Sequence, residues 1–244
     1  MATETEIATE AWRLFPHSMG RRLSERSYKA PQHVEFISWL LYLSATHKNR
    51  RPILPRLGIS LPPGSGKSEI VDFYNPIWLL EHDPRRRIIL SSYAGTLAEE
   101  QGKRVRNQIE MAQDQLTVRI MQDSRASDRW RTDKNGGMWT VGVGGSITGR
   151  RASNFLIDDP HKNFAEAMAE KNQIDVWNWY TSTARTRLLP GSSLLVVQTR
   201  WAGGDLIGRL KEADEDKPQW VYVNVPAIAE ENEKLLIEKQ PSGA

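Results

Sequence analysis

The chain has 244 residues, with 33 Lys and Arg against 30 Asp and Glu and a net charge of +3. This length suits one α/β domain with its own core, and so slight a positive excess allows a nucleic-acid partner without arguing for one. The lack of cysteine excludes disulfides and thiolate metal sites, and the five histidines do not have metal-ligand spacing. No apolar run comes near the length of a membrane span, about 20 residues. We therefore expect a soluble protein of a reducing compartment.

Hydrophobic periodicity predicts strands that alternate with helices along most of the chain. Helices are expected over residues 4–16 and 33–47, from residue 68 to about residue 80, and over 96–112, 164–180 and 204–213. Strands are expected over 56–61, 87–93, 154–157, 193–199 and 220–225, with a hairpin from 128–132 and 138–143. Pro76 predicts a kink or an early end of the third helix. Such alternation indicates β-α-β units and a largely parallel sheet covered by helices on both faces.

A glycine-bearing loop follows the first core strand. Residues 61–68 read LPPGSGKS between an apolar strand and a helical pattern, which is the layout of a phosphate-binding P-loop, although Leu61 stands where that motif has its first glycine. Backbone N–H groups of such a loop and the helix N-terminus bind a polyphosphate. Lys67 is expected to reach the β- and γ-phosphates of ATP, and the Ser68 hydroxyl to join the Mg²⁺ shell. The residues expected around the nucleotide are Pro63, Gly64, Ser65, Gly66, Lys67, Ser68 and Glu69.

A second motif ends the apolar run 155–157 with Asp158 and Asp159. Asp158 is expected to hold Mg²⁺ through water, and Asp159 stands where many P-loop ATPases have a glutamate that polarises the attacking water. An Asp-Asp pair that caps the next helix is the alternative. The strand 87–93 lies between the two motifs in sequence and indicates the RecA-like P-loop class, in which an additional strand separates them. We therefore expect an α/β P-loop NTPase of this class.

Three further stretches carry a family resemblance: SYAGTLA at 92–98, GVGGSITGR at 142–150 and QTRWAGGDLIGRL at 198–210. Together with the two motifs above, they closely resemble the large terminase subunit of tailed double-stranded DNA bacteriophages, over residues 31–229. The resemblance implies an ATPase that drives double-stranded DNA into an empty capsid. It also implies a homo-oligomeric ring on the portal protein, a small terminase subunit as partner, and the host cytoplasm as location, with a monomer in isolation.

The resemblance assigns further residues. It places Gln32 near the adenine, and Thr199 and Arg200 in a motif that couples the nucleotide state to movement. Arg150 or Arg151 is implied as a finger that reaches into a neighbouring subunit's site. Many relatives carry an arginine inside the P-loop, and this chain has glycine and serine there.

The resemblance also predicts how the chain is divided. A helical segment is expected over 1–50, the ATPase core over 51–213, and a strand and tail over 214–244, leading toward a nuclease domain outside this chain. No acidic cluster beyond the ATP site looks like a two-metal nuclease, so we expect this chain to hydrolyse ATP and not to cut DNA.

Two alternatives stay open. PPGSGKS also resembles a helicase P-loop, but that function requires a second RecA-like domain, which 244 residues do not hold. The other alternative is a scaffold that binds ATP without hydrolysing it and recruits portal or small-subunit partners. Three basic clusters are candidates for phosphate contact: 21–22, 85–87 and 129–131.

Overall fold

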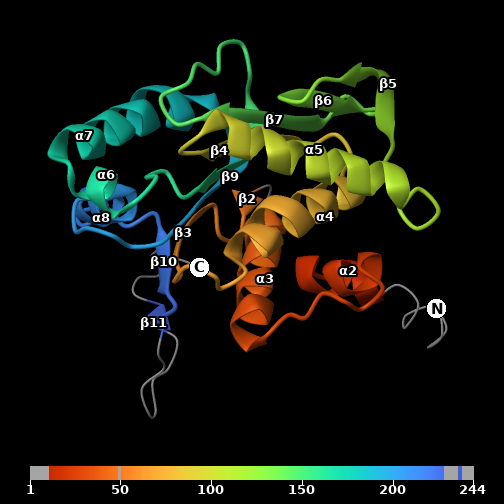
Figure 1. Ribbon diagram of the computed structural model, residues 1–244, viewed down its shortest axis with the longest axis horizontal. Coiled ribbons are helices and arrows are strands. Elements are labelled where there is room, and N and C mark those ends of the chain that lie inside the picture. Colours follow the sequence, from red (N-terminus) through yellow and green to blue (C-terminus); the bar gives the residue numbers. More distant parts are fainter. Residues whose placement is uncertain (1–10, 49–50, 228–235, 238–244) are drawn as a thin grey trace.

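The computed structural model describes residues 11–48, 51–227 and 236–237, so most of the helix predicted over 4–16 lies outside the described residues. Within these ranges, nine strands form the central sheet in the order β11-β10-β3-β9-β8-β4-β7-β6-β5 (Figure 1). Six neighbours run parallel: β10 (Val221–Asn224), β3 (Arg56–Ser60), β9 (Leu188–Gln198), β8 (Ala152–Asp158), β4 (Arg87–Ser92) and β7 (Gly137–Gly142). Antiparallel strands close both edges: β11 (Leu236–Ile237), β6 (Arg129–Thr132) and β5 (Ile120–Arg125).

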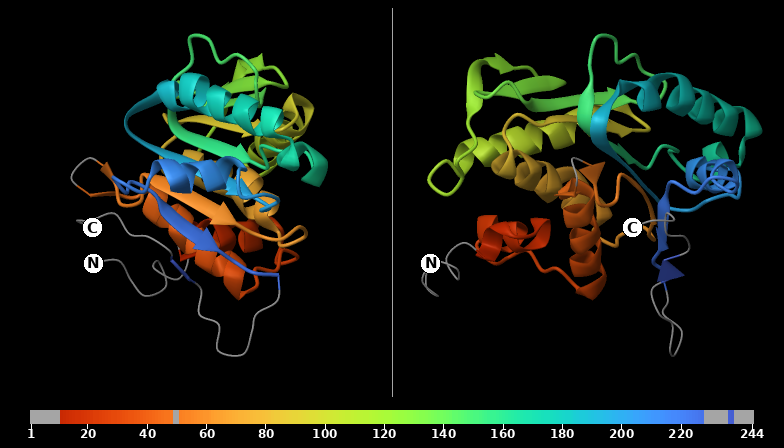
Figure 2. Two further views of the ribbon diagram at one scale, coloured as in Figure 1. Left: turned by 90° about the vertical axis from the view of Figure 1, so that its left-hand side faces the viewer. Right: turned by 180° about the vertical axis from the view of Figure 1, so that it is seen from behind.

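Helices cover both faces of this sheet, as the sequence predicted (Figure 2). One face packs against α2 (Pro16–Leu23), α3 (Gln32–Ala45), α4 (Asn75–His82) and α5 (Gly95–Met111). The other packs against α7 (Glu170–Trp179) and α8 (Leu206–Ala213). Each face of the sheet carries a hydrophobic core, and the parallel strands contribute side chains to both. In β8, Leu156 belongs to the core beside α2–α5, while Phe155 and Ile157 belong to the core beside α7 and α8. Such two-sided burial explains why these strands are continuous apolar runs in the sequence.

The strand that separates the P-loop strand from the Asp158 strand is not the predicted one. β9 pairs with β3 on one side and with β8 on the other, whereas β4 lies beyond β8. The RecA-like class is therefore confirmed, but the prediction that 87–93 is the separating strand is wrong. Parallel strands are joined by crossovers, so order along the chain does not determine order in the sheet.

The helix after the P-loop carries the predicted kink without ending early. Residues Glu69–Tyr74 form a π-helical turn, and α4 continues from Asn75 to His82. Pro76 lacks an N–H and its ring would clash with the carbonyl of Asp72, four residues earlier, in an unbroken α-helix. Widening to a π-turn relieves that clash, and the backbone N–H of Asn75 donates to Ile70 O instead.

Other boundaries also differ from the predicted ones. The helix predicted over 164–180 is broken at Ala169 into α6 (Phe164–Met168) and α7, and a second π-turn, Tyr180–Ala184, follows. β9 begins five residues before the predicted strand, and β5 was not predicted. The short pair β1 (His47–Lys48) and β2 (Arg51–Pro52) lies apart from the central sheet. No described helix is long and apolar enough to cross a membrane.

Candidate nucleotide site

The P-loop connects β3 to the helix at the carboxyl edge of the parallel strands. Gly64 and Gly66 have φ of 72° and 79°, the left-handed region that glycine adopts without strain. A Cβ would meet nothing within 4 Å at Gly64 and only Val34, at 3.8 Å, at Gly66, so backbone conformation and not space requires these glycines. The ring of His33, on α3, donates from Nε2 to the Ser65 carbonyl oxygen at 2.9 Å and holds the loop against that helix.

Five of the sequence-predicted residues converge here, at the ends of three neighbouring strands. Lys67 Nζ forms an ion pair with Asp159 Oδ2 at 2.7 Å and lies 3.5 Å from Thr199 Oγ1. The Ser68 hydroxyl donates to Asp158 Oδ2 at 2.8 Å. The backbone N–H of Thr199 donates to Asp159 Oδ1 at 2.9 Å. The arrangement joins the P-loop, the two aspartates and the end of β9 in one hydrogen-bonded cluster.

Asp159 connects the other members of that cluster. Its φ of 41° lies in the left-handed region, which a non-glycine residue adopts only when its surroundings impose it. Its backbone bonds to both neighbouring strands, the N–H donating to Val197 O and the carbonyl accepting from Tyr93 N. The carboxylate is thereby turned toward Lys67 instead of following the strand.

A further carboxyl group, that of Asp72, lies against Asp158. Asp72 is 3% exposed and Asp158 is 6% exposed. Burial, and next the negative charge of Asp158, raise the pKa of Asp72 well above its ordinary value. Burial also raises the pKa of Asp158, against the opposing effects of its hydrogen bonds with Asp72 and Ser68 and of the charge on Lys67. The Oδ1 atoms of both carboxyl groups are buried without a hydrogen-bond partner.

The cluster opens into a hollow of about 190 Å³ between the P-loop helix, β4, β8 and α5, whose polar lining includes Ser68, Asp72, Ser92, Asp158 and Asp159. Hydroxyl and carboxylate oxygens are the ligands that Mg²⁺ prefers, so this lining fits that ion. Within the described part of the chain, no three His, Asp or Glu side chains group closely enough to hold a metal alone. The remaining ligands would come from a bound phosphate and water, as is usual for Mg²⁺ at nucleotide sites.

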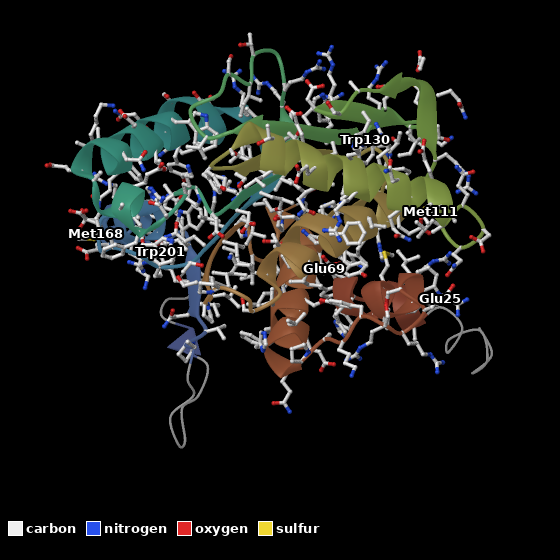
Figure 3. The ribbon with its side chains drawn as sticks, viewed as in Figure 1. Glu25, Glu69, Met111, Trp130, Met168 and Trp201 are labelled. Atoms are coloured by element: carbon white, nitrogen blue, oxygen red, sulfur yellow. The ribbon has the colours of Figure 1, made fainter. Side chains whose placement is uncertain are left out.

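Other predicted residues lie around the cluster without joining it. Gln32 is exposed at the first position of α3, next to the histidine that holds the loop. The Glu69 carboxylate pairs with Arg104 of α5 at 3.0 Å (Figure 3). Arg200 Nε donates to Asp205 Oδ2 at 2.9 Å, which ties the end of β9 to the start of α8. A wider hollow of about 1020 Å³ beside α2 is lined by none of the predicted site residues.

Arg150 and Arg151 are separated from the site of their own chain. Both are exposed and precede β8, whereas Asp158 ends it, and seven strand residues span roughly 20 Å. The Arg150 guanidinium lies over the ring of Trp139 at 5.5 Å. The backbone of both arginines therefore lies at the end of β8 away from Asp158.

Sequence reasoning missed two buried polar residues of the site. Asp72 is a lone acid within the apolar run from Ile70 to Tyr74, and that contrast was the available signal. Gln198 ends β9 beside the P-loop, where Leu61 N donates to its carbonyl oxygen at 3.1 Å. Its side-chain amide is 1% exposed, and neither amide atom has a partner. It begins the stretch 198–210 that carries the family resemblance, but it was assigned no role.

The fold and this cluster define a P-loop NTPase domain of the RecA-like, additional-strand class. The chain belongs to the family described as "Terminase large subunit, T4likevirus-type, N-terminal", which it matches over residues 59–240. It is thus a phage large terminase subunit sequence. A search of curated proteins finds no match.

Solved structures resemble its fold. The HK97 bacteriophage large terminase superposes with a TM-score of 0.52 at 14% identity, over 83% of this chain and 41% of that one. A Dbp5 variant from S. cerevisiae bound to Gle1 and IP6 superposes with a TM-score of 0.53 at 13% identity, over 89% of this chain and 52% of that one. The chain therefore spans about half the length of these proteins, and the likeness shows the fold alone.

Proposed function

We propose that this chain is the ATP-hydrolysing motor domain of a viral DNA-packaging terminase, which couples Mg²⁺-dependent ATP hydrolysis to the movement of double-stranded DNA into the procapsid. The observation that carries the proposal is the ion pair of Lys67 with Asp159, beside the hydrogen bond of Ser68 with Asp158. Residues about ninety positions apart in sequence meet at the carboxyl edge of the sheet, where α/β proteins bind ligands.

The contacts of Asp159 suggest how ATP engages the site. Lys67 is 8% exposed and is held by Asp159. The phosphates of ATP compete for the same ammonium group, which frees Asp159 to orient the attacking water. Ser68 and Asp158 would hold Mg²⁺, which would supply positive charge against the phosphates. These residues thus exchange partners when nucleotide binds.

The same carboxylate connects the nucleotide to a surface segment. Asp159 accepts from Thr199 N, and the next residue, Arg200, is paired with Asp205 at the start of α8. The ring of Trp201 then meets Phe164 of α6 edge-on at 6.4 Å, at the end of the molecule where Figure 3 labels Met168 beside it. A shift of Asp159 is therefore transmitted to α6 and α8. We infer that Thr199 and Arg200 couple hydrolysis to movement through this path.

The remaining parts of the proposal concern assembly. We propose a homo-oligomeric ring on the portal protein, with the small terminase subunit as a further partner, and Gln32 beside the adenine. Because Arg150 and Arg151 lie at the opposite end of β8 from Asp158, we propose an arginine finger that acts on the site of a neighbouring subunit. We propose that one of these two residues acts there.

Phosphate release tests the activity. Lys67→Ala and Asp159→Ala are expected to lower the rate by about 10²–10³, the loss that follows removal of one preorganised electrostatic group. Lys171→Ala is the control, because this exposed lysine pairs only with Asp175 on the surface of α7. Near wild-type hydrolysis by both site variants would contradict the proposal.

A helicase-type remodelling ATPase is the second candidate, since the P-loop sequence also fits that class and the Dbp5 variant shares the fold. Strand separation on a forked duplex distinguishes the two. Unwinding by this chain would favour the helicase, and ATP hydrolysis stimulated by duplex without unwinding would favour the packaging motor.

A further inference from the structure

Asp72 owes its position to the π-turn that follows the P-loop. Ser68 and Asp72 are four residues apart, so both side chains leave the same face of the helix, and both line the hollow that contains Asp158. The π-turn over Glu69–Tyr74 and Pro76 determine how this face meets the sheet. π-turns within helices frequently occur at functional sites.

Three buried acids outside the site, Glu81, Asp205 and Asp214, accept hydrogen bonds from backbone N–H groups. Glu81 accepts from Thr117 and Val118, and Asp214 from Gln219 and Trp220. Asp205 accepts from three N–H groups and from the Arg200 guanidinium. These carboxylates stabilise turns and helix starts. They show what a structural buried acid looks like in this fold.

Asp72 has none of those partners. It is as buried as the others, at 3% exposed, yet its Oδ1 atom has no donor and its carboxyl group is hydrogen-bonded to another acid, Asp158. Buried polar atoms are nearly always paired, so an acid left in this state needs an explanation. Among the residues that the structure describes, Lys67 is the cation whose charge acts on Asp72 and Asp158, and it is already paired with Asp159.

A divalent cation would supply the positive charge that the three acids Asp72, Asp158 and Asp159 lack. Two positive charges balance the excess acid, and the side chains of Asp72 and Asp158, each with one unpartnered oxygen, line the hollow together with Ser68. We propose that Asp72 is a cation-binding residue of the site, which acts with Ser68 and Asp158 on the divalent ion that accompanies the nucleotide. This inference rests on the proposed ATPase function and adds to it a carboxylate from the P-loop helix.

Mn²⁺ binding tests the inference, measured by electron paramagnetic resonance in the presence of a nonhydrolysable ATP analogue. Asp72→Asn keeps the shape of the side chain and removes its charge. We expect the Mn²⁺ affinity to fall by about 10–100-fold, the usual loss when a supporting group of a metal site is removed. We also expect the melting temperature without divalent ions to rise by about 2–4 °C, because an unpaired acid has been replaced.

Asp214→Asn is the matched control, since Asp214 is equally buried but accepts two N–H groups. It is expected to lower the melting temperature and to leave Mn²⁺ affinity unchanged. Asp72→Ala, which removes the oxygens entirely, is expected to weaken Mn²⁺ binding at least as much as Asp72→Asn. Wild-type Mn²⁺ affinity in Asp72→Asn, or unfolding of that variant, would overturn the inference, because Asp72 would then be a structural acid.

Binding of the ATP analogue, measured together with Mn²⁺ binding, distinguishes a failure of this inference from a failure of the proposed function. If wild type binds the analogue and Lys67→Ala does not, while Asp72→Asn binds Mn²⁺ as wild type does, only the inference about Asp72 fails. If wild type binds neither Mn²⁺ nor the analogue, the ATPase proposal fails, and the inference fails with it.

Discussion

The two ends of β8 carry buried polar groups of opposite character. At the amino end, Asn154 is 3% exposed, donates to Ser193 Oγ at 2.8 Å and accepts from Arg86 at 3.2 Å. Arg86 also donates to Ala45 O at 3.0 Å. At the carboxyl end, Asp158 is buried almost as deeply, but it lies against a second acid and keeps an unpartnered oxygen.

The comparison shows that burial alone does not tell a structural polar residue from a binding one. Both ends of one strand exclude water to a similar degree. At the amino end the protein supplies the partners, so the amide network stabilises the fold. At the carboxyl end the partners are incomplete, which is the state expected of a site that waits for a ligand.

The largest expected effect is a loss of ATP hydrolysis when the candidate arginine finger is removed. The finger lies in the loop before the amino end of β8, so this prediction concerns the amino end of β8 in one subunit and the carboxyl end of β8 in its neighbour. In the assembled ring, Arg150→Ala or Arg151→Ala is expected to lower ATP hydrolysis by about 10³–10⁵, the range found for arginine fingers. The isolated chain should lose far less. Phosphate release by ring and monomer measures both, with the exposed Arg129→Ala as control.

Rings assembled from two variants, Lys67→Ala and a variant that lacks the finger, test whether the arginine acts on the neighbouring subunit. A Lys67→Ala subunit still carries its arginines and is expected to restore hydrolysis to a neighbour that lacks the finger. Hydrolysis that stays as low in mixed rings as in rings of either variant alone would contradict a role in trans.

Removing a member of the hydrogen-bonded network at the amino end of β8 is expected to give the next largest effect, a loss of folding stability. Asn154→Ala removes the donor to the buried Ser193 Oγ and one of the two hydrogen-bond partners of the half-buried Arg86, and each buried unpaired group costs about 1–3 kcal/mol. We expect urea denaturation to show a loss of about 2–3 kcal/mol, with nucleotide affinity unchanged in the folded variant. The exposed Asn178→Ala is the control. An equal loss in both variants would show that the network does not stabilise the fold.

The carboxyl end is expected to give a smaller effect of opposite sign. Asp72→Asn should gain about 1 kcal/mol near pH 7, since an unpaired buried acid is removed. In the folded chain the pKa of Asp72 is raised, with Asp158, Asp159 and Lys67 as its charged neighbours. Between the ordinary pKa of 3.8 and that raised value, the folded state holds more protons than the unfolded state, so wild-type stability falls as pH rises.

The gain from Asp72→Asn should therefore disappear at pH values well below the ordinary pKa of 3.8, where Asp72 is protonated in both states, and grow as pH increases. Denaturation curves of both proteins at several pH values measure it. A difference that is independent of pH would show that charge at position 72 is not the cause.

Local patterns were sufficient for the P-loop, for the Asp158 motif and for most helices and strands. Glycines, an apolar strand and a following helix determine the P-loop within eight residues, and two-sided burial makes the parallel strands apolar throughout. Element ends were less predictable: Ala169 breaks a continuous helical pattern, because its extended backbone ends one helix and begins the next.

The sequence by itself thus determined the class of fold, the family and most of the residues that meet at the candidate nucleotide site, because each depends on neighbours along the chain. The tertiary structure decided which strand separates the two motifs, that Lys67 rests on Asp159, that Asp72 lies against Asp158, and that the arginines are at the far end of β8. Those facts depend on crossovers and on contacts between residues tens of positions apart, and local spacing does not constrain them.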